Sequence, residues 1–223
     1  MFTLTLPAAG ARLDAVLAEA AADARFAVPA VATGDVTYQH EETVDVVPIV
    51  LLADGRTLRV EIGGVRALVR GSKALVWENG VLQARRDRPI IGSNVLFEDL
   101  AVFVPSLLHF PQISDDGFSG VVVTSAPRQP SVYELVVYTF APAGGRLVGA
   151  KYYRDAVNNL VKRASWSEFT EVAGQARPQR MVMTDVAEPR TTTLTLVWSA
   201  RPDLPRRLFT PASLAESSRA LVD

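Results

Sequence analysis

Apolar and polar residues alternate along most of this chain, and the alternation is clearest near its C-terminal end. Leu194, Leu196 and Trp198 occupy one set of alternate positions, while threonine and valine fill the positions between and before them. A period of two predicts a strand with one face toward an apolar interior. Three strand-like runs within residues 150–198 are each followed by turn residues, at Asn158–Asn159, at 173–175 and at 187–189, so this stretch predicts a meander of antiparallel strands.

The N-terminal part predicts one helix followed by a meander of strands. Leu13, Leu17 and Ala20 recur at helical spacing within a helix expected over residues 11–26 (Ala11 to Phe26), and Pro29 should end it. From residue 34 onward the period changes to two, and dipeptides that favour tight turns separate the runs. The strands predicted in this part cover residues 35–40, 44–52, 57–62, 65–69, 75–77 and 81–84.

The sheet pattern stops at Pro89, and a short helix is predicted from Asn94 to Phe103. Asn94 can cap this helix, and Glu98 and Asp99 near its start favour the positive end of the helix dipole. Residues 106–110 predict an irregular apolar piece, and strand patterns return over 118–124, 132–140 and 147–153. Residues 211–220 predict a short helix or tail.

These elements predict a single domain over residues 1–223 that is mainly β (α+β). About ten or eleven antiparallel strands are expected, and a strongly twisted sheet of that size tends to curl or close. We therefore predict an unclosed antiparallel β-barrel. The N-terminal helix and the short helix of residues 94–103 would cover its concave side, the second as a lid.

Composition narrows the class of protein. Hydrophobic residues make up 48% of the chain, enough for a sizeable core, yet no apolar run approaches the roughly 18 residues of a membrane span. The formal net charge is −1, and no basic stripe indicates nucleic-acid binding. The chain has no cysteine, which excludes disulfides, thiolate catalysis and cysteine-ligated metal.

No pattern of catalytic or metal-ligating residues stands out. His40 is near Glu41, Glu42 and Asp45, but a polar strand end and turn explains this group better than a cation site. The second histidine, His109, lies in an apolar loop far along the chain. A nucleophile elbow is also absent, so we expect no catalytic residue, no metal and no cofactor, and we expect that the protein is not an enzyme.

Three segments resemble a known family. They are Gly92-Ser93-Asn94-Val95-Leu96-Phe97-Glu98-Asp99-Leu100, the run from Lys151-Tyr152-Tyr153 through Met181 and Met183 to Leu196, and the ending Leu208-Phe209-Thr210-Pro211. In their order they resemble the outer-membrane lipoprotein-sorting proteins, the LolA-like family, and in particular an uncharacterised branch of it. The resemblance covers about the C-terminal two thirds, and the N-terminal third matches in layout. Asn94 stands where that branch usually has an acid, and Val95 where it has an aromatic.

The resemblance implies an unclosed barrel plugged by helices and a periplasmic carrier of lipid or acylated lipoprotein. An inner-membrane transporter and an outer-membrane acceptor are then the candidate partners, with no nucleic acid and no transmembrane segment. Residues 1–6 lack the basic start and the length of a signal sequence, so export would need a signal peptide absent from this sequence.

Alternating apolar residues supply the candidate wall of a ligand cavity. We predict that the cavity is lined by Leu58, Val60, Ile62, Trp77, Leu96, Leu100, Phe103, Leu135, Val137, Met181, Met183, Leu194 and Leu196. The same pattern fits a packed barrel core equally well, and two methionines on one strand face do not decide between them. A sheet larger than eight strands leaves room that either a ligand or the helices must fill.

Two function hypotheses remain open, beside an enzyme as the weakest. In the first, the protein is a carrier that shields acyl chains between membranes. In the second, it is an envelope interaction or sensor module that binds a protein partner without transport. Native mass spectrometry of purified protein separates them, because only the carrier should retain lipid.

Overall fold

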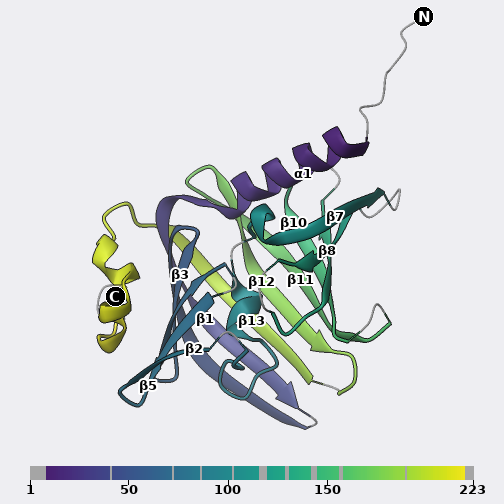
Figure 1. Ribbon diagram of the computed structural model, residues 1–223. Coiled ribbons are helices and arrows are strands. Elements are labelled where there is room, and N and C mark those ends of the chain that lie inside the picture. Colours follow the sequence, from purple (N-terminus) through teal and green to yellow (C-terminus); the bar gives the residue numbers. More distant parts are fainter. Residues whose placement is uncertain are drawn as a thin grey trace, which may run out of the picture.

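The computed structural model describes residues 9–40, 42–71, 73–85, 87–101, 103–115, 120–128, 131–141, 145–155, 158–188 and 190–218 of the 223-residue chain. One α-helix, α1 (Ala9–Ala24), precedes a large sheet (Figure 1). The strands of its first half are β1 (Phe26–His40), β2 (Thr43–Gly55), β3 (Thr57–Ile62), β4 (Val65–Arg70), β5 (Lys73–Glu78) and β6 (Val81–Ala84). Those of its second half are β7 (Leu108–Asp115), β8 (Val121–Pro127), β9 (Leu135–Phe140), β10 (Leu147–Tyr153), β11 (Leu160–Val172), β12 (Gln175–Asp185) and β13 (Arg190–Ala200).

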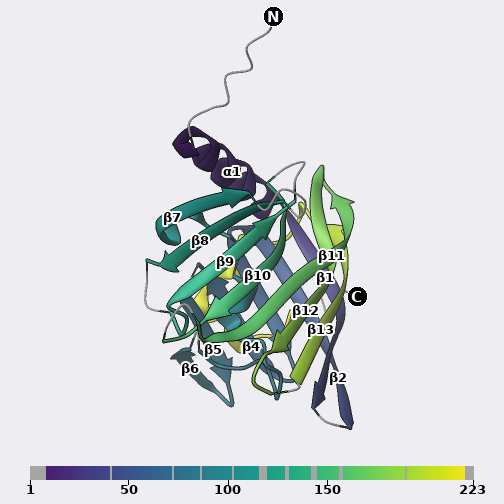
Figure 2. The same cartoon turned by 90° about the vertical axis from the view of Figure 1, so that its right-hand side faces the viewer.

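All thirteen strands belong to one antiparallel sheet with the order β6-β5-β4-β3-β2-β1-β13-β12-β11-β10-β9-β8-β7. Neighbouring strands are consecutive in the chain at every position except β1–β13, where the two halves join. The sheet therefore ends at β6 and β7, the two strands between which the chain leaves the sheet. Figures 1 and 2 show the sheet curling around an interior, with α1 lying across one opening.

The alternation of side chains sorts the residues of each strand to the two faces of the curled sheet. In β3, Leu58, Val60 and Ile62 point to the concave face and join the main core, while Arg59 and Glu61 point to the convex face. A second core cluster lies under α1, where Leu17 and Ala20 pack near Phe103, Val123 and Phe140. The interior is thus covered by apolar strand faces and by one helix.

The C-terminal segment, residues 201–218, packs on the convex face. It contains two 3-10 helices, η3 (Arg206–Phe209) and η4 (Pro211–Ala215). Leu204 and Leu208 fill a small apolar cluster with β1 and β2. The buried Arg59 guanidinium donates to Glu61 Oε1 at 2.8 Å, to the Leu208 carbonyl at 3.0 Å and to Ser213 Oγ at 2.9 Å. This ion pair therefore binds the end of the chain to the outside of the sheet.

The predicted fold is confirmed as mainly β and unclosed, but the number of strands and several boundaries differ; β1, for example, begins at Phe26 rather than at residue 35. There are thirteen strands rather than ten or eleven, because residues 106–110 belong largely to η2 (Pro105–Leu107) and β7 instead of an irregular piece. The N-terminal helix covers residues 9–24 rather than 11–26. Pro29 and Pro111 both lie inside strands, where shifts of register between Phe26 and Ala30 and between His109 and Gln112 accommodate a residue without an N–H. Residues 211–220 contain η4, and 219 and 220 lie outside the described residues.

The prediction of a lid helix over residues 94–103 is wrong, because the described part of this stretch forms only a bridge and a short 3-10 helix. Residues 87–101, which we call the inner segment, hold one bridge, Pro89–Leu96, and one 3-10 helix, η1 (Phe97–Leu100). The Asp99 carboxylate accepts the N–H of Leu96 at 2.8 Å, which caps η1 at its start and so makes the helix begin at Phe97 rather than at Asn94. A short polar side chain that binds nearby backbone competes with a longer helix. Val102, within the predicted helix, lies outside the described residues.

Candidate functional site

The inner segment lies in the interior of the curled sheet. Its residues Val95, Leu96 and Phe97 are buried in the main core, against strands of both halves. Gly92 has a φ of +68°, and a Cβ there would approach Tyr38 Cε2 to 3.1 Å, so glycine provides the turn that sends the chain inward. The segment that connects the two free edges of the sheet thus fills part of the space that the sheet encloses.

Side-chain hydrogen bonds fix the inner segment to β12 and β13. The Asn94 amide donates to the carbonyl of Met183 at 3.3 Å and to that of Arg190 at 3.1 Å. The N–H of Asn94 donates to Thr192 Oγ1 at 3.3 Å. On the other side, the Glu98 carboxylate accepts a hydrogen bond from the Ser131 hydroxyl and from the N–H of residue 132, each at 3.2 Å.

A buried ion pair holds the end of this segment. Lys162 Nζ on β11 lies 3.3 Å from Asp99 Oδ2, and it also donates to the Asn94 carbonyl. Asp99 Oδ1 accepts the Tyr133 hydroxyl at 2.8 Å. The Asp99 side chain is 0% exposed, and this burial raises its pKa, although the Lys162 charge and the hydrogen bonds from Leu96 and Tyr133 act in the opposite direction. The pair is therefore held where the charged form of a carboxyl group is costly.

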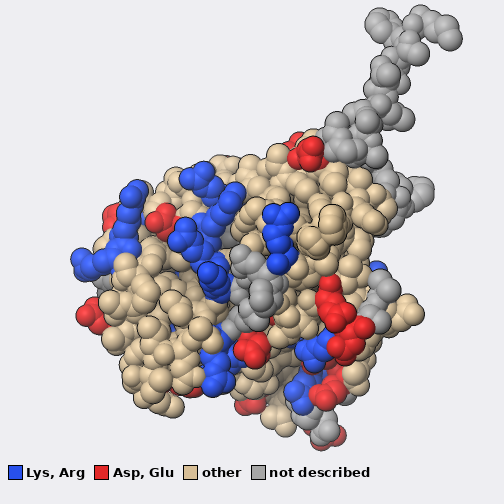
Figure 3. Space-filling view, in the orientation of Figure 1, with Lys and Arg blue, Asp and Glu red and all other residues tan. Residues whose placement is uncertain are grey.

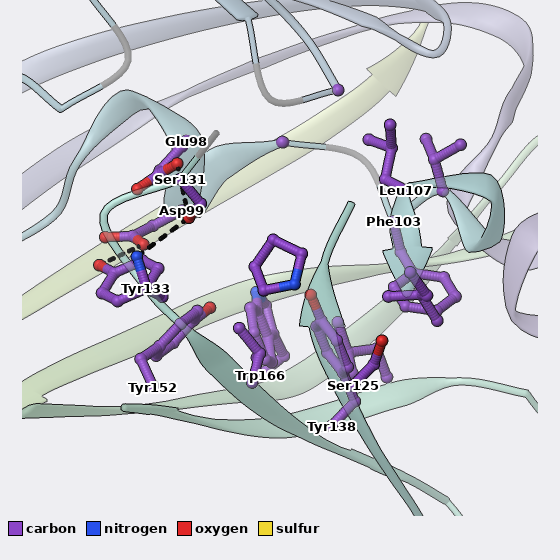
Figure 4. Close-up of a pocket in the computed structure, with 17 residues that line it drawn as sticks. Glu98, Asp99, Phe103, Leu107, Ser125, Ser131, Tyr133, Tyr138, Tyr152 and Trp166 are labelled. Carbon is purple, nitrogen blue, oxygen red and sulfur yellow. Dashed lines mark hydrogen bonds between the residues drawn. The ribbon is translucent and has the colours of Figure 1, made fainter. Parts of the chain in front are cut away.

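Two cavities lie on either side of the end of the inner segment. The apolar cavity, of about 150 Å³, lies between α1 and the concave faces of β1, β12 and β13. The polar cavity, of about 110 Å³, lies against β8, β9, β10 and β11 (Figure 4). Both are lined by Asp99, Ala101, Phe103, Leu147 and Trp166. Small-molecule sites usually measure about 300–1,000 Å³, so in this conformation the interior is mostly filled by protein.

Helix α1 covers the apolar cavity and is fixed at its C-terminal end by β12. The Arg177 guanidinium donates to the carbonyls of Asp23 at 2.6 Å and Arg25 at 2.8 Å, and Gln175 donates to the carbonyl of residue 22 at 3.1 Å. A cation at this helix end also suits the helix dipole. Burial lowers the pKa of Arg177, while the Asp23 charge opposes this. Gly145, after β9, lies so close to α1 that a Cβ there would come within 2.3 Å of the backbone nitrogen of Ala20.

The sequence-predicted lining residues fall into three groups. Six line the apolar cavity, namely Leu58, Leu100, Phe103, Met181, Leu194 and Leu196. Four are packed in the main core outside both cavities, namely Val60, Ile62, Leu96 and Met183. The remaining three, Trp77, Leu135 and Val137, lie on the other face of the sheet.

The prediction that Trp77, Leu135 and Val137 line the cavity is wrong, and the reason is the same in β5 and β9. Val137 pairs with Lys151 and Thr124, whereas its neighbours Val136 and Tyr138 face the interior. Trp77 pairs with Arg66, whose guanidinium stacks on its ring at 4.0 Å. In both strands apolar residues stand at consecutive positions, so the alternation does not identify the inward face.

Sequence reasoning missed the polar side chains of the interior. Lys162, Ala164 and Trp166 alternate on the inward face of β11, and Ala150 and Tyr152 do so on β10. Lys162 alternates with Ala164 and Trp166 in the sequence, and a lysine at such a position could have indicated a buried ion pair. The Glu98–Asp99 pair was interpreted as helix caps. Asp99 does cap η1 through the Leu96 N–H, but both carboxylates also bind groups that lie more than thirty residues further along the chain.

Some features elsewhere bear on other functions. Among the described residues, no cluster of three histidine or acidic side chains is placed to hold a metal ion, and Glu41 of the group considered above lies outside them. None of the helices in the described ranges is long and apolar enough to cross a membrane. Outside the interior, a groove of about 650 Å³ at the ends of β3–β6 is lined by Arg70, Lys73 and Arg85. Figure 3 shows basic side chains gathered on the upper left of the visible face.

Comparison with solved structures identifies the fold. A domain from Vibrio parahaemolyticus, described as that of an outer membrane lipoprotein-sorting protein, is 15% identical over 90% of this chain and 97% of that chain, with a TM-score of 0.76. A LolA superfamily protein from Nitrosomonas europaea is 21% identical over 92% of this chain and 98% of the other, with a TM-score of 0.69. A DUF1329 family protein from Desulfovibrio piger is 14% identical over 92% and 98%, with a TM-score of 0.74.

Comparison of sequences gives the family. No curated protein matches the chain. A family model described as that of an uncharacterized protein matches residues 82–216, a range that includes the inner segment and β7–β13. The resemblance inferred from Gly92–Leu100 is thus confirmed at the level of fold. The chain belongs to this uncharacterised family, and its fold is that of the LolA superfamily.

Proposed function

We propose that the protein is a periplasmic carrier that shields the acyl chains of a lipid or lipoprotein between membranes, without catalysis. The observation that supports this most is the apolar cavity, which is lined by strand side chains of both halves of the sheet and covered by α1. The likeness to a lipoprotein-sorting domain supports it at the level of fold. Acyl chains are the chemistry that such a cavity would accept, because its strand-derived lining is largely apolar.

The energetic need for a carrier is large. Moving an acyl chain from membrane to water costs about 0.8 kcal/mol per CH₂, so a chain of about sixteen carbons costs on the order of 12 kcal/mol. Unaided diffusion is then negligible, and burial in the apolar cavity would offset most of the cost. The cavity of about 150 Å³ is too small for such a chain. Uptake therefore requires that α1 or the inner segment moves outward.

Two neighbouring methionines give the sharpest test. Met181 lines the apolar cavity, whereas Met183, two residues along β12, is 0% exposed and lies outside both cavities. We expect Met183→Trp to overpack the core and to lower the free energy of unfolding by about 1–3 kcal/mol. Met181→Trp should destabilise less, because the ring can enter the cavity, and should block uptake of the methyl ester of parinaric acid, a fluorescent acyl probe.

Urea denaturation measures the first quantity, and fluorescence titration measures the second. Native mass spectrometry of the wild-type protein should also find co-purified lipid. The proposal fails if the wild type binds no acyl ester and both variants are strongly destabilised, because the interior would then be a packed core.

One observation favours the alternative, an interaction or sensor module of the same fold. Phe110, on the edge strand β7, is 78% exposed and has a φ of +49° where the register shifts. An exposed aromatic side chain on a sheet edge is a typical contact for another protein. In that case Phe110→Ser would abolish partner binding and leave acyl-probe uptake unchanged.

A further inference from the structure

Three hydrogen-bond donors in the polar cavity have no partner within the described chain. They are the hydroxyls of Tyr138 and Tyr152 and the indole N–H of Trp166, and all three residues line this cavity. Tyr152 is 6% exposed, and Tyr133 beside it differs because its hydroxyl donates to Asp99. Figure 4 shows the polar atoms of Tyr152, Trp166 and Tyr138 turned toward the same side of the cavity.

The sheet itself brings these side chains together. Tyr138 of β9 is paired with Ala150 of β10, and Ala150 is paired with Ala164 of β11. Tyr152 and Trp166 follow two positions after these alanines, on the same inward face. Small side chains between three large ones leave a depression, and the donors surround it. Tyr138 and Trp166 are half-buried, so these donors face the cavity, where a ligand oxygen can accept from them in place of water.

The charges around the cavity determine which acceptor fits. Glu98 and Asp99 line it, and no lysine, arginine or histidine is among the described residues that do. Lys162, which lies beside the cavity at Asp99, already binds Asp99 and the Asn94 carbonyl. Burial raises the pKa of Tyr138 and Tyr152, and the two carboxylates raise it further. The phenols therefore stay protonated as donors, and the two carboxylates disfavour binding of a further anion.

We propose that the polar cavity binds the uncharged carbonyl of an acyl ester or amide, while the attached hydrocarbon chain lies in the adjoining apolar cavity. This inference rests on the proposed carrier function and specifies its ligand as an esterified or amidated acyl chain instead of a free fatty acid. Five residues line both cavities, and the bond between the carbonyl group and the hydrocarbon chain of the ligand would lie beside them. Neutral donors suit a neutral acceptor, whereas a carboxylate would meet two like charges.

The test compares two probes that share one chain, parinaric acid and its methyl ester, at pH 8, where the acid is ionised. The wild-type protein should bind the ester at least tenfold more tightly. Tyr138→Phe and Tyr152→Phe should each lower ester affinity about threefold to tenfold, and the double variant more, since each loses one hydrogen bond. Tyr153→Phe is the matched control, because Tyr153 lies next to Tyr152 in β10 on the opposite face.

Infrared spectroscopy of a ¹³C-labelled ester carbonyl gives a readout that a structural role would not move. The bound carbonyl band should lie at lower frequency in the wild type and shift upward in the double variant, whose melting temperature is measured in parallel. Ester binding with unshifted affinity and band in the Phe variants overturns this inference and leaves the carrier standing. Tighter binding of the acid overturns it too. Binding of neither probe overturns both proposals.

Discussion

Two buried ion pairs bind short segments to opposite faces of the same sheet, and they differ in how well each is satisfied. On the convex face, Arg59 and Glu61 bind the C-terminal segment through Leu208, Ser213 and Ser218. On the concave face, Lys162 holds the inner segment through a contact of 3.3 Å with Asp99 and a hydrogen bond to the Asn94 carbonyl. The side chains of both pairs are at most 10% exposed to solvent.

The pKa directions of the two carboxyl groups express this difference. Burial would raise the pKa of Glu61, but hydrogen bonds from Ser218 and the Arg59 charge outweigh it and lower the pKa. At Asp99 burial prevails, and the pKa is raised. The convex pair thus favours its charged form, whereas the concave pair is retained at a cost. Under the proposed carrier function, in which α1 or the inner segment moves outward, the inner segment is held by the weaker of the two arrangements.

The largest expected effect comes from breaking the convex pair. Arg59→Met leaves Glu61 buried without its cation and frees the carbonyls that the guanidinium binds, so we expect a loss of about 3–5 kcal/mol in the free energy of unfolding. Arg66→Met is the matched control, because Arg66 also binds the C-terminal segment, through Ala215, from a partly exposed position. Urea denaturation of both variants measures the difference. If both variants lost the same free energy of unfolding, the buried pair of Arg59 and Glu61 would contribute no more to stability than the partly exposed Arg66.

A smaller effect is expected on the concave face. Asp99→Asn keeps a polar group beside Lys162 but removes the charge, and should cost about 1–3 kcal/mol. Adding Lys162→Met should recover part of this loss, because no buried cation then remains without an anion. Hydrogen exchange should show faster opening of residues 97–101 in Asp99→Asn than in the wild type. Unchanged exchange would show that packing alone holds the inner segment.

The smallest expected effect is the change with pH in how much Glu61→Gln and Asp99→Asn lower the melting temperature. Because the pKa of Glu61 is lowered, its charge stabilises the fold above the ordinary glutamate pKa of about 4.3, and this is lost as the pH falls through the folded-state value. Because the pKa of Asp99 is raised, its ionisation costs stability, and this cost disappears as the pH falls and the carboxyl group is protonated. Melting temperatures between pH 3 and pH 7 should therefore show the defect of Glu61→Gln shrinking as the pH falls, whereas the defect of Asp99→Asn should grow. Shrinkage of both defects toward low pH would contradict the comparison.

Sequence alone predicts the strands better than it predicts what they enclose. Clean alternation at Leu58 and at Leu194–Leu196 identified the inward face, because polar or small residues fill the positions between. In β5 and β9 consecutive apolar residues hide the phase, so Trp77, Leu135 and Val137 were assigned to the wrong face. Phase in such strands is decided by pairing with neighbours, which a local pattern does not contain.

The interior site depends on contacts between distant parts of the chain. Asp99 meets Tyr133 and Lys162 only because the inner segment folds back into the sheet. Pro29 and Pro111 were read as breaks, yet each is accommodated where the register shifts within a strand. Propensity describes a residue in an average environment, and a large sheet with irregularities supplies unusual ones.

The pairing of β1 with β13 has a consequence for how the protein acquires its structure. Every other neighbouring pair of strands is joined by a connection along the chain, so the two halves of the sheet can form from mainly local contacts. The β1–β13 ladder, in which Gly34 pairs with Leu196, closes a loop that contains most of the sequence. Folding should therefore be completed late, after synthesis of the last strand. A Cβ at Gly34 would meet the carbonyl oxygen of Thr195 at 1.8 Å, which makes this glycine the point at which the two halves can come together.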